Sequence, residues 1–339
     1  MRGAPGRAPA RQPGRPVKPK RPAARRRRWR RALAGLGLGL AAAAVAGYAA
    51  LWAIPPLHRL ALETVVTSGH SGLARFVATP AQLHRSLSAW LDTPDLQVLT
   101  AVQPGPAASA GVSVQPIRGA AWQGWMLLVP DPAWVHVAMT ADVGRVGEQV
   151  SQFGAQAGAI AAVNGGGFQD AMGNGTGGLP VGVSASSGHF SDYPDLSGDY
   201  VIGFDGGGRL DVGKWTEAAA EAVGIRDAVS FKPLLVVDGQ PEITSGDGGW
   251  GVAPRTAIGQ RADGTVIFVV IDGRQPGSLG ATLREVQDLM LAQGAVTAVN
   301  LDGGSSTTLW YRGHVVNNPC CSPNGERYIA TAFLISPPA

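Results

Sequence analysis

The chain has 339 residues, a formal net charge of +4, 48 glycines and 25 prolines. This length suffices for one large domain with additional segments, and the glycine and proline content indicates a loop-rich domain. The charge is unevenly distributed, because residues 1–31 contain 13 lysines and arginines and no acidic residue, which leaves −9 on the remainder. An acidic body argues against nucleic acid as a partner.

The N-terminal part of the chain predicts a membrane anchor. We expect residues 1–31 to form a disordered, basic, cytoplasmic tail and the uncharged residues 32–54 to form a transmembrane helix. Such a helix would be about 34 Å long, against about 30 Å for a hydrocarbon core. The arginine cluster then places the following domain outside the cytoplasm. A cleavable signal peptide is the alternative, because Ala44-Val45-Ala46 resembles a cleavage site, but the apolar run is longer than is usual for one.

Residues 55–110 predict a membrane-proximal helical stalk and linker without chemistry, followed by the main domain over residues 111–339. In that domain, short apolar runs separated by turns predict strands, and residues 145–157 predict a helix. The expected strands cover residues 124–129, 135–139, 159–163, 181–184 and 201–204. We therefore expect an α+β fold, with a mixed β-sheet and packed helices, preceded by one transmembrane helix.

The stretch 265–310 predicts strand, helix and strand in succession. The first strand, 265–271, ends at Asp272, and the second, 295–301, ends at Asp302. Thr282 begins the helix between them with a capping box. A crossover of this kind makes the two strands parallel, so both aspartates should lie at the same edge of a sheet.

Glycines follow directly after three of the expected strands, in the loops 164–168, 272–274 and 302–308. Such loops can bring backbone N–H groups against an anionic ligand, although Asp-Gly and Asn-Gly are also ordinary turn signals. Arg255 lies just before an apolar strand that should pair with 266–271. Its guanidinium suits a phosphate or carboxylate, and an ion pair with a nearby aspartate is the alternative.

Five motifs occur in one order, and together they resemble the phosphodiester glycosidase family over roughly residues 112–335. They are NGGGF at 164–168, PRTAIG at 254–259, IDGR at 271–274, TLREVQDLMLAQGAV at 282–296 and NLDGGSSTT at 300–308. Two positions depart from the family pattern. Ser305 stands where a third glycine is usual, and the first motif has one terminal aromatic residue where the family has two.

The resemblance implies hydrolysis of a carbohydrate phosphodiester, on a cell-envelope glycopolymer or exopolysaccharide. Asp272 and Asp302 are then the expected catalytic carboxylates, and Arg255 and Arg274 would neutralise the phosphate. The full expected substrate-binding set is Asn164, Gly165, Gly166, Arg255, Thr256, Arg274, Gly303, Gly304, Ser305 and Ser306, with Glu326 as a reserve acid.

Several alternatives stay open at this stage. The domain could bind anionic polysaccharide without turnover, whereas a P-loop or a nucleophile elbow is absent from the sequence. We expect no cofactor, but Ca²⁺ or Mg²⁺ is compatible with the oxygen atoms of Asp272, Asp302 and Asn164. The only cysteines, Cys320 and Cys321, are adjacent and could form a vicinal disulfide or remain two thiols.

Overall fold

The structure is a computed structural model that describes residues 23–66, 73–91, 97–98, 102, 111–170, 175–195, 198–322 and 325–338. The chain forms two compact units, Met1–Ala53 and Ile54–Ala339. In the first unit, helix α1 covers Ala23–Ala53. Its part Ala32–Ala53 is long and apolar enough to cross a membrane, a test that a signal sequence also passes. The helix begins within the tail expected to be disordered, of which residues 1–22 lie outside the described residues.

The second unit begins with the helices α2 (Pro55–Val66), α3 (Ala74–Val77) and α4 (Pro80–Leu91). Most of the described residues of this segment are helical, and the expected linker at 103–110 lies outside the described residues. Helix α2 contacts the main domain, because the Val252 N–H donates to the Thr64 hydroxyl at 3.3 Å. Helix α2 is therefore bonded to the loop before β13.

Three β-sheets make up the main domain, and every strand pair among the described residues is antiparallel. The first sheet has the spatial order β1 (Gln97–Val98), β9 (Leu210–Gly213), β8 (Tyr200–Asp205), β10 (Ile225–Phe231), β6 (Gly182–Ser186) and β7 (His189–Tyr193). The second has the order β12 (Gln240–Pro241), β11 (Leu234–Val237), β15 (Ala295–Leu301), β13 (Arg255–Arg261), β14 (Val266–Ile271), β3 (Gln123–Val129) and β2 (Ser113–Arg118). The third has the order β17 (His314–Val315), β16 (Leu309–Tyr311), β5 (Ala161–Asn164), β18 (Thr331–Ile335) and β4 (Val135–Met139).

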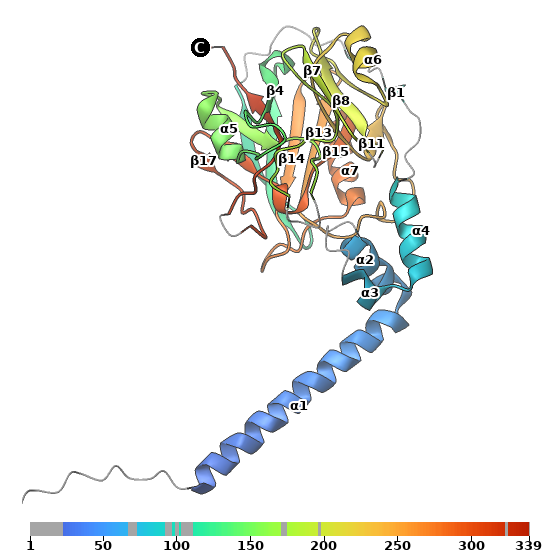
Figure 1. The fold of residues 1–339 in the computed structure, drawn as a ribbon, viewed down its shortest axis with the longest axis vertical. Coiled ribbons are helices and arrows are strands. Elements are labelled where there is room, and N and C mark those ends of the chain that lie inside the picture. Colours follow the sequence, from blue (N-terminus) through green and yellow to red (C-terminus); the bar gives the residue numbers. More distant parts are fainter. Residues whose placement is uncertain are drawn as a thin grey trace, which may run out of the picture. The chain divides into compact units, whose positions relative to one another are not determined.

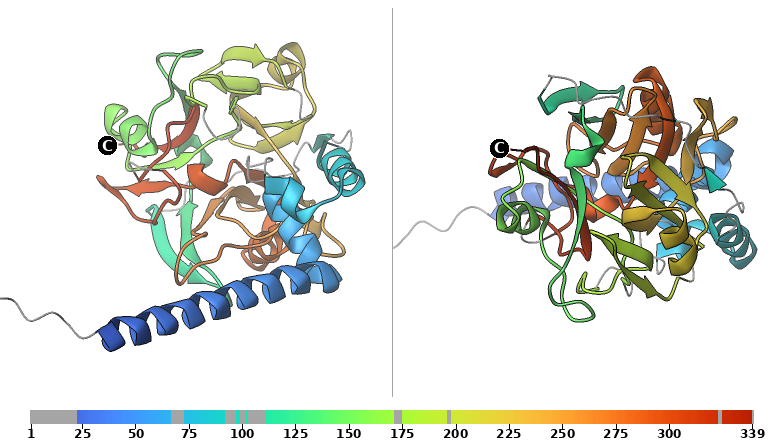
Figure 2. Two further views of the ribbon diagram at one scale, coloured as in Figure 1. Left: turned by 60° about the horizontal axis from the view of Figure 1, so that its bottom comes forward. Right: turned by 90° about the horizontal axis from the view of Figure 1, so that it is seen from above.

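One hydrophobic core is shared by the three sheets, and a helix packs on the other face of each. Phe268 of β14 and Phe333 of β18 meet in the shared core with ring centroids 5.4 Å apart. Helices α5 (Val150–Gln156), α6 (Glu217–Ala222) and α7 (Leu283–Ala292) lie against the third, first and second sheet respectively (Figure 1). Figure 2 shows the C-terminal strand β18, in dark red, beside strands coloured green from the first half of the domain. The expected α+β fold with packed helices is thus confirmed, whereas the expected mixed β-sheet is corrected, because the described strands pair only antiparallel with their neighbours.

The burial of strand β14 on both faces explains why its sequence is apolar without interruption. Val266, Phe268 and Val270 point into the shared core, and the residues between them pack under α7, as expected for a strand that is buried on both faces. Strands β14 and β15 both pair antiparallel with β13, so they run parallel to each other without being neighbours. The expectation that they end at one sheet edge is confirmed, and so is the capping box at Thr282.

Candidate active site

The loops singled out by sequence converge at the start of β13. Arg255 pairs with Ile271 and Thr256 with Leu301, so the first residues of β13 lie between the ends of β14 and β15. Asn164, the last residue of β5, joins this edge from the third sheet. Its amide Nδ2 donates to the Asp302 carbonyl at 2.5 Å, and its Oδ1 accepts from the Thr256 hydroxyl at 2.8 Å.

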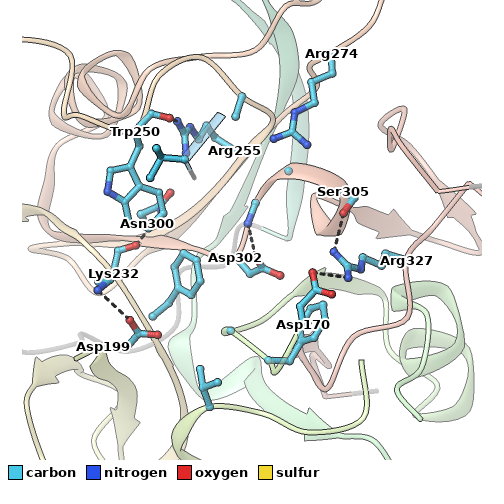
Figure 3. Close-up of a pocket in the computed structure, with 18 residues that line it drawn as sticks. Asp170, Asp199, Lys232, Trp250, Arg255, Arg274, Asn300, Asp302, Ser305 and Arg327 are labelled. Atoms are coloured by element: carbon cyan, nitrogen blue, oxygen red, sulfur yellow. Dashed lines mark hydrogen bonds and ion pairs between the residues drawn. The ribbon is translucent and has the colours of Figure 1, made fainter. Parts of the chain in front are cut away.

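A cavity of about 340 Å³ opens at this junction (Figure 3). Its lining is both polar and aromatic, and includes the edge-on pair Phe231 and Trp250, whose ring centroids lie 6.0 Å apart. Its lining consists of Val66, Gly167, Phe168, Asp170, Val181, Asp199, Phe231, Lys232, Trp250, Ala253, Arg255, Arg274, Asn300, Asp302, Gly303, Gly304, Ser305 and Arg327. A space of this volume and mixed lining is typical of a small-molecule site.

Asp302 lies at the centre of the lining in Figure 3. Its carboxylate accepts from the Gly303 N–H at 2.9 Å. Burial raises the pKa of Asp302 to about 6; a neighbouring Asp170 acts in the same direction, whereas Ser306 and Arg327 oppose it. A carboxyl group that titrates near neutral pH in a cavity can both take up and release a proton.

The two predicted arginines, Arg255 and Arg274, both line the cavity but differ in their partners. Arg255 is only 4% exposed and donates to three backbone carbonyls, those of Trp250, Gly251 and Ala281. Burial is the main cause that lowers its pKa to about 9. Arg255 therefore holds the loop before β13 in place through its Nε and Nη2 groups.

Arg274 is exposed, and its guanidinium lies beside Gly304 at the cavity. Within the described part of the chain, no carboxylate or carbonyl pairs with this guanidinium. Its backbone φ is 57°, in the left-handed region that non-glycine residues rarely adopt, and such conformations concentrate at functional sites. Arg274 thus presents unused donors to a ligand.

Two ion pairs in the lining were not predicted from sequence. Arg327 bonds Asp170 at 2.6 Å and donates to the Ser305 hydroxyl at 3.0 Å. Lys232 and Asp199 face each other at 3.7 Å, with side chains 2% and 4% exposed. Asp170 lies two residues after NGGGF and Arg327 directly follows the predicted Glu326, so proximity to the motifs is a signal that could have identified both. No local pattern marks the Lys232–Asp199 pair.

Asp272, expected to be catalytic, is absent from the lining. Its carboxylate is 4% exposed and accepts from the Asn317 side chain at 3.0 Å and from the Asn318 N–H at 2.9 Å. The alternation of side chains along the strands explains the separation. Arg255 pairs with Ile271, whereas the next residue, Thr256, pairs with Leu301. Asp272 and Asp302 follow Ile271 and Leu301 and therefore occupy alternate positions of the pleat, whose side chains point to opposite faces of a sheet. The expected pair of aspartates in one pocket is therefore corrected.

Six further expected ligand-binding residues lie outside the lining: Asn164, Gly165, Gly166, Thr256, Ser306 and Glu326. Their polar groups are used within the fold. The N–H groups of Gly165 and Gly166 donate to the Thr331 carbonyl and hydroxyl at 2.9 and 3.1 Å. The Glu326 carboxylate accepts from the Ser151 N–H at 2.9 Å, at the start of α5. The expected residues that do line the cavity are Asp302, Arg255, Arg274, Gly303, Gly304 and Ser305.

The expected oxygen ligands for Ca²⁺ or Mg²⁺ do not form one site. Asn164 Oδ1 accepts from the Thr256 hydroxyl and the Thr308 N–H, and the Asp272 carboxylate is bonded outside the cavity. Over the described ranges, no group of three or more His, Cys, Asp or Glu residues is arranged to hold a metal ion. A cation in the cavity would need a different set of ligands.

Curated relatives match short parts of the chain. The SPbeta prophage-derived uncharacterized protein YomE of Bacillus subtilis (strain 168) is 36% identical over 119 residues, which are 34% of this chain and 18% of that protein. The N-acetylglucosamine-1-phosphodiester alpha-N-acetylglucosaminidase of Bos taurus is 35% identical over 92 residues, 26% of this chain and 17% of the enzyme. The matched stretches thus span less than a fifth of these relatives.

Solved structures and a family model extend the match. The zebrafish N-acetylglucosamine-1-phosphodiester alpha-N-acetylglucosaminidase catalytic domain, auto-inhibited by its pro-peptide, has a TM-score of 0.57 at 22% identity, covering 71% of this chain and 87% of that one. A hypothetical protein from Synechocystis has a TM-score of 0.52 at 17% identity, covering 66% and 61%. These two share the fold. The phosphodiester glycosidase model matches residues 157–336, more than half of the chain, and this protein therefore belongs to the phosphodiester glycosidase family.

Proposed function

We propose that the protein hydrolyses sugar-1-phosphodiesters, releasing the sugar and leaving a phosphomonoester. The observation that supports this most directly is the pair of groups in one cavity: a carboxyl group with a pKa of about 6, Asp302, and the guanidinium of Arg274, which no described residue neutralises. A proton-handling carboxylate and a free cation are what cleavage at a phosphorylated anomeric carbon requires.

In the proposed reaction, water attacks the anomeric carbon while the bond from that carbon to the phosphate oxygen breaks. The phosphomonoester leaves with the electron pair of that bond, and Arg274 neutralises its negative charge. Asp302 accepts the proton of the attacking water in its ionised form. Because a phosphate group leaves readily as an anion, the step needs base assistance more than acid assistance.

The remaining lining suits the two ends of such a substrate. Phe231 and Trp250 offer an apolar surface to one face of a sugar ring. Ser305 and Arg327 lie on the same side as Asp302 and provide further donors for phosphate oxygens. The Lys232–Asp199 pair offers a donor and an acceptor to sugar hydroxyls.

We further propose that the domain acts outside the cytoplasm, anchored by α1, on cell-envelope glycopolymer or exopolysaccharide. The basis is the apolar segment Ala32–Ala53 together with the arginine-rich residues that precede it, which retain an N-terminus in the cytoplasm. Protease added to intact cells should digest the main domain and spare the N-terminal tail. Digestion only after lysis would contradict this placement.

The activity is tested with the full chain in detergent micelles. Glucosyl and N-acetylglucosaminyl 1-(methyl phosphate) diesters of both anomers are incubated with the protein, with and without chelator, and released reducing sugar is measured. We expect release from at least one of them, and none from the Asp302→Asn variant. Binding of these diesters without release by the wild-type chain would instead identify a binding module for anionic polysaccharide.

A further inference from the structure

Asp272 follows an apolar strand in the same way as Asp302, yet it does not belong to the lining of the cavity that contains Asp302. Both of its side-chain bonds go to one loop: Asn317 Nδ2 donates to Asp272 Oδ1 at 3.0 Å, and the Asn318 N–H donates to the same oxygen at 2.9 Å. Asp272 is 4% exposed and Asn317 is 9% exposed. A buried carboxylate that receives two donors fixes the groups that donate to it.

The loop whose groups donate to Asp272, residues 317–322, also contacts the turn that contains Arg274. Gln275 Nε2 donates to the Asn318 carbonyl at 3.0 Å, and the Asn318 amide donates to the Gln275 side chain. Arg274 is therefore flanked in sequence by two residues, Asp272 and Gln275, that both bond Asn318. The bonds to Asn318 thus hold the backbone on both sides of Arg274, whose guanidinium lines the cavity.

The turn needs such support because its backbone is unusual. Arg274 has a φ of 57°, and its N–H donates to the Leu279 carbonyl at 3.1 Å. Left-handed conformations of non-glycine residues persist only where surrounding contacts over-determine them. Asn317 extends the support to the second cavity loop, since its side chain also bonds the Thr307 carbonyl and the Leu309 N–H at 3.0 and 2.8 Å.

We propose that Asp272 is a positioning residue, which holds the loop 317–322 as a brace and thereby fixes the guanidinium of Arg274 against the phosphate of the substrate. This proposal depends on the proposed function for the identity of the substrate, but the brace itself can be tested on phosphate alone. It predicts that Asp272 affects the reaction only through Arg274, whereas a catalytic carboxylate would act independently of it.

Two substitutions at this position separate the two roles. In Asp272→Asn, the remaining Oδ1 still accepts both bonds as a neutral acceptor, so kcat/KM should stay within about fivefold of wild type. Loss of a catalytic acid or base would cost about 10²–10⁴-fold instead. In Asp272→Ala both bonds disappear, and the displaced guanidinium should raise KM and lower kcat/KM by about 10²-fold.

A double-mutant cycle with Arg274→Ala tests whether the effects share one path. It is measured on the full chain by calorimetric binding of inorganic phosphate and by kcat/KM, with Asp263→Ala as control. Asp263 lies in the turn at the other end of β14, and its single side-chain bond among the described residues is the one it accepts from the Thr265 N–H, at 2.9 Å. We expect Asp272→Ala to weaken phosphate binding about as much as Arg274→Ala does, and to have no further effect in the Arg274→Ala background.

Three results would overturn the proposal. Asp272→Asn could be as inactive as Asp302→Asn, the effects of Asp272→Ala and Arg274→Ala could multiply, or phosphate binding could be independent of Arg274 in the wild-type chain. Melting temperatures are compared for all variants, and the Asn variant keeps the test decisive if Asp272→Ala does not fold. Phosphate binding requires no turnover, so failure of the brace is distinguishable from failure of the proposed hydrolysis.

Discussion

The loops after β14 and β15 begin with the same residues, an aspartate followed by glycine, and have opposite roles in the structure. Asp302 faces the cavity, where burial raises its pKa to about 6. Asp272 is withdrawn from the cavity and bonded by Asn317 and Asn318. One position in the pleat and one packed loop distinguish them. A motif thus specifies the backbone at a strand end, and the neighbours of the side chain decide its chemistry.

The largest expected effect is loss of hydrolysis in Asp302→Asn. The amide cannot accept the proton of water, so kcat should fall by about 10²–10⁴-fold with little change in KM. The measurement is steady-state release of reducing sugar from the diester that the wild-type chain cleaves. Activity retained by Asp302→Asn would show that Asp302 is not the base of the reaction.

The two arginines sharpen the same contrast between ligand-facing and fold-supporting groups. Arg274→Ala should lower kcat/KM by about 10²–10³-fold and leave the free energy of unfolding nearly unchanged, because its guanidinium has no described partner. Arg255→Ala leaves three carbonyls without their donors and should lower the free energy of unfolding by about 3 kcal/mol or more. Denaturant unfolding and kinetics of both variants check this. Equal loss of stability would contradict the assignment.

The pKa of Asp302 predicts opposite effects of pH on activity and on stability. Its folded value of about 6 lies above the unfolded value, so the native state is penalised once Asp302 ionises; this penalty is absent below about pH 4 and complete above about pH 6. Asp302→Asn should therefore raise the free energy of unfolding at pH 8, by on the order of 1–3 kcal/mol, and change it little at pH 4. Wild-type kcat/KM should rise through about pH 6, as the base of the free enzyme ionises.

Burial is the main cause of the raised pKa of Asp302; the charge of Asp170 raises it further, whereas Ser306 and Arg327 oppose it. Asp170→Asn removes the neighbouring negative charge, so the acid limb of the pH–rate profile should move to lower pH. An unchanged limb in this variant, or equal stability of Asp302→Asn and wild type at both pH values, would mean that another group governs the profile.

The strands β14 and β15 and the place of Asp302 in the cavity lining could be predicted from the sequence, because strands and strand-end loops depend on local patterns. Continuous apolar runs predicted β14 and β15, since each is buried on both faces. The role of Asp272 was missed because its partner Asn317 lies 45 residues away in an irregular loop. Glu326, the predicted reserve acid, lies outside the cavity lining, whereas the adjacent Arg327 belongs to it. The Lys232–Asp199 pair joins two segments that no motif connects.

The smallest expected effect concerns the disulfide between the adjacent residues Cys320 and Cys321, which lies within the loop that braces Arg274. Reduction by a dithiol converts the disulfide to two thiols and the dithiol to its cyclic disulfide. The hydrogen bonds of the loop at Asn317, Asn318 and Ser322 remain, so KM for the phosphodiester should rise by only about threefold, the order of one neutral hydrogen bond, with kcat unchanged. The Cys320→Ser, Cys321→Ser double variant should show the raised KM without reductant and no response to it. Because Cys320 and Cys321 are the only cysteines of the sequence, a response in the double variant would reflect an effect of the reductant itself. An unchanged KM in the reduced wild type would exclude the disulfide from the brace.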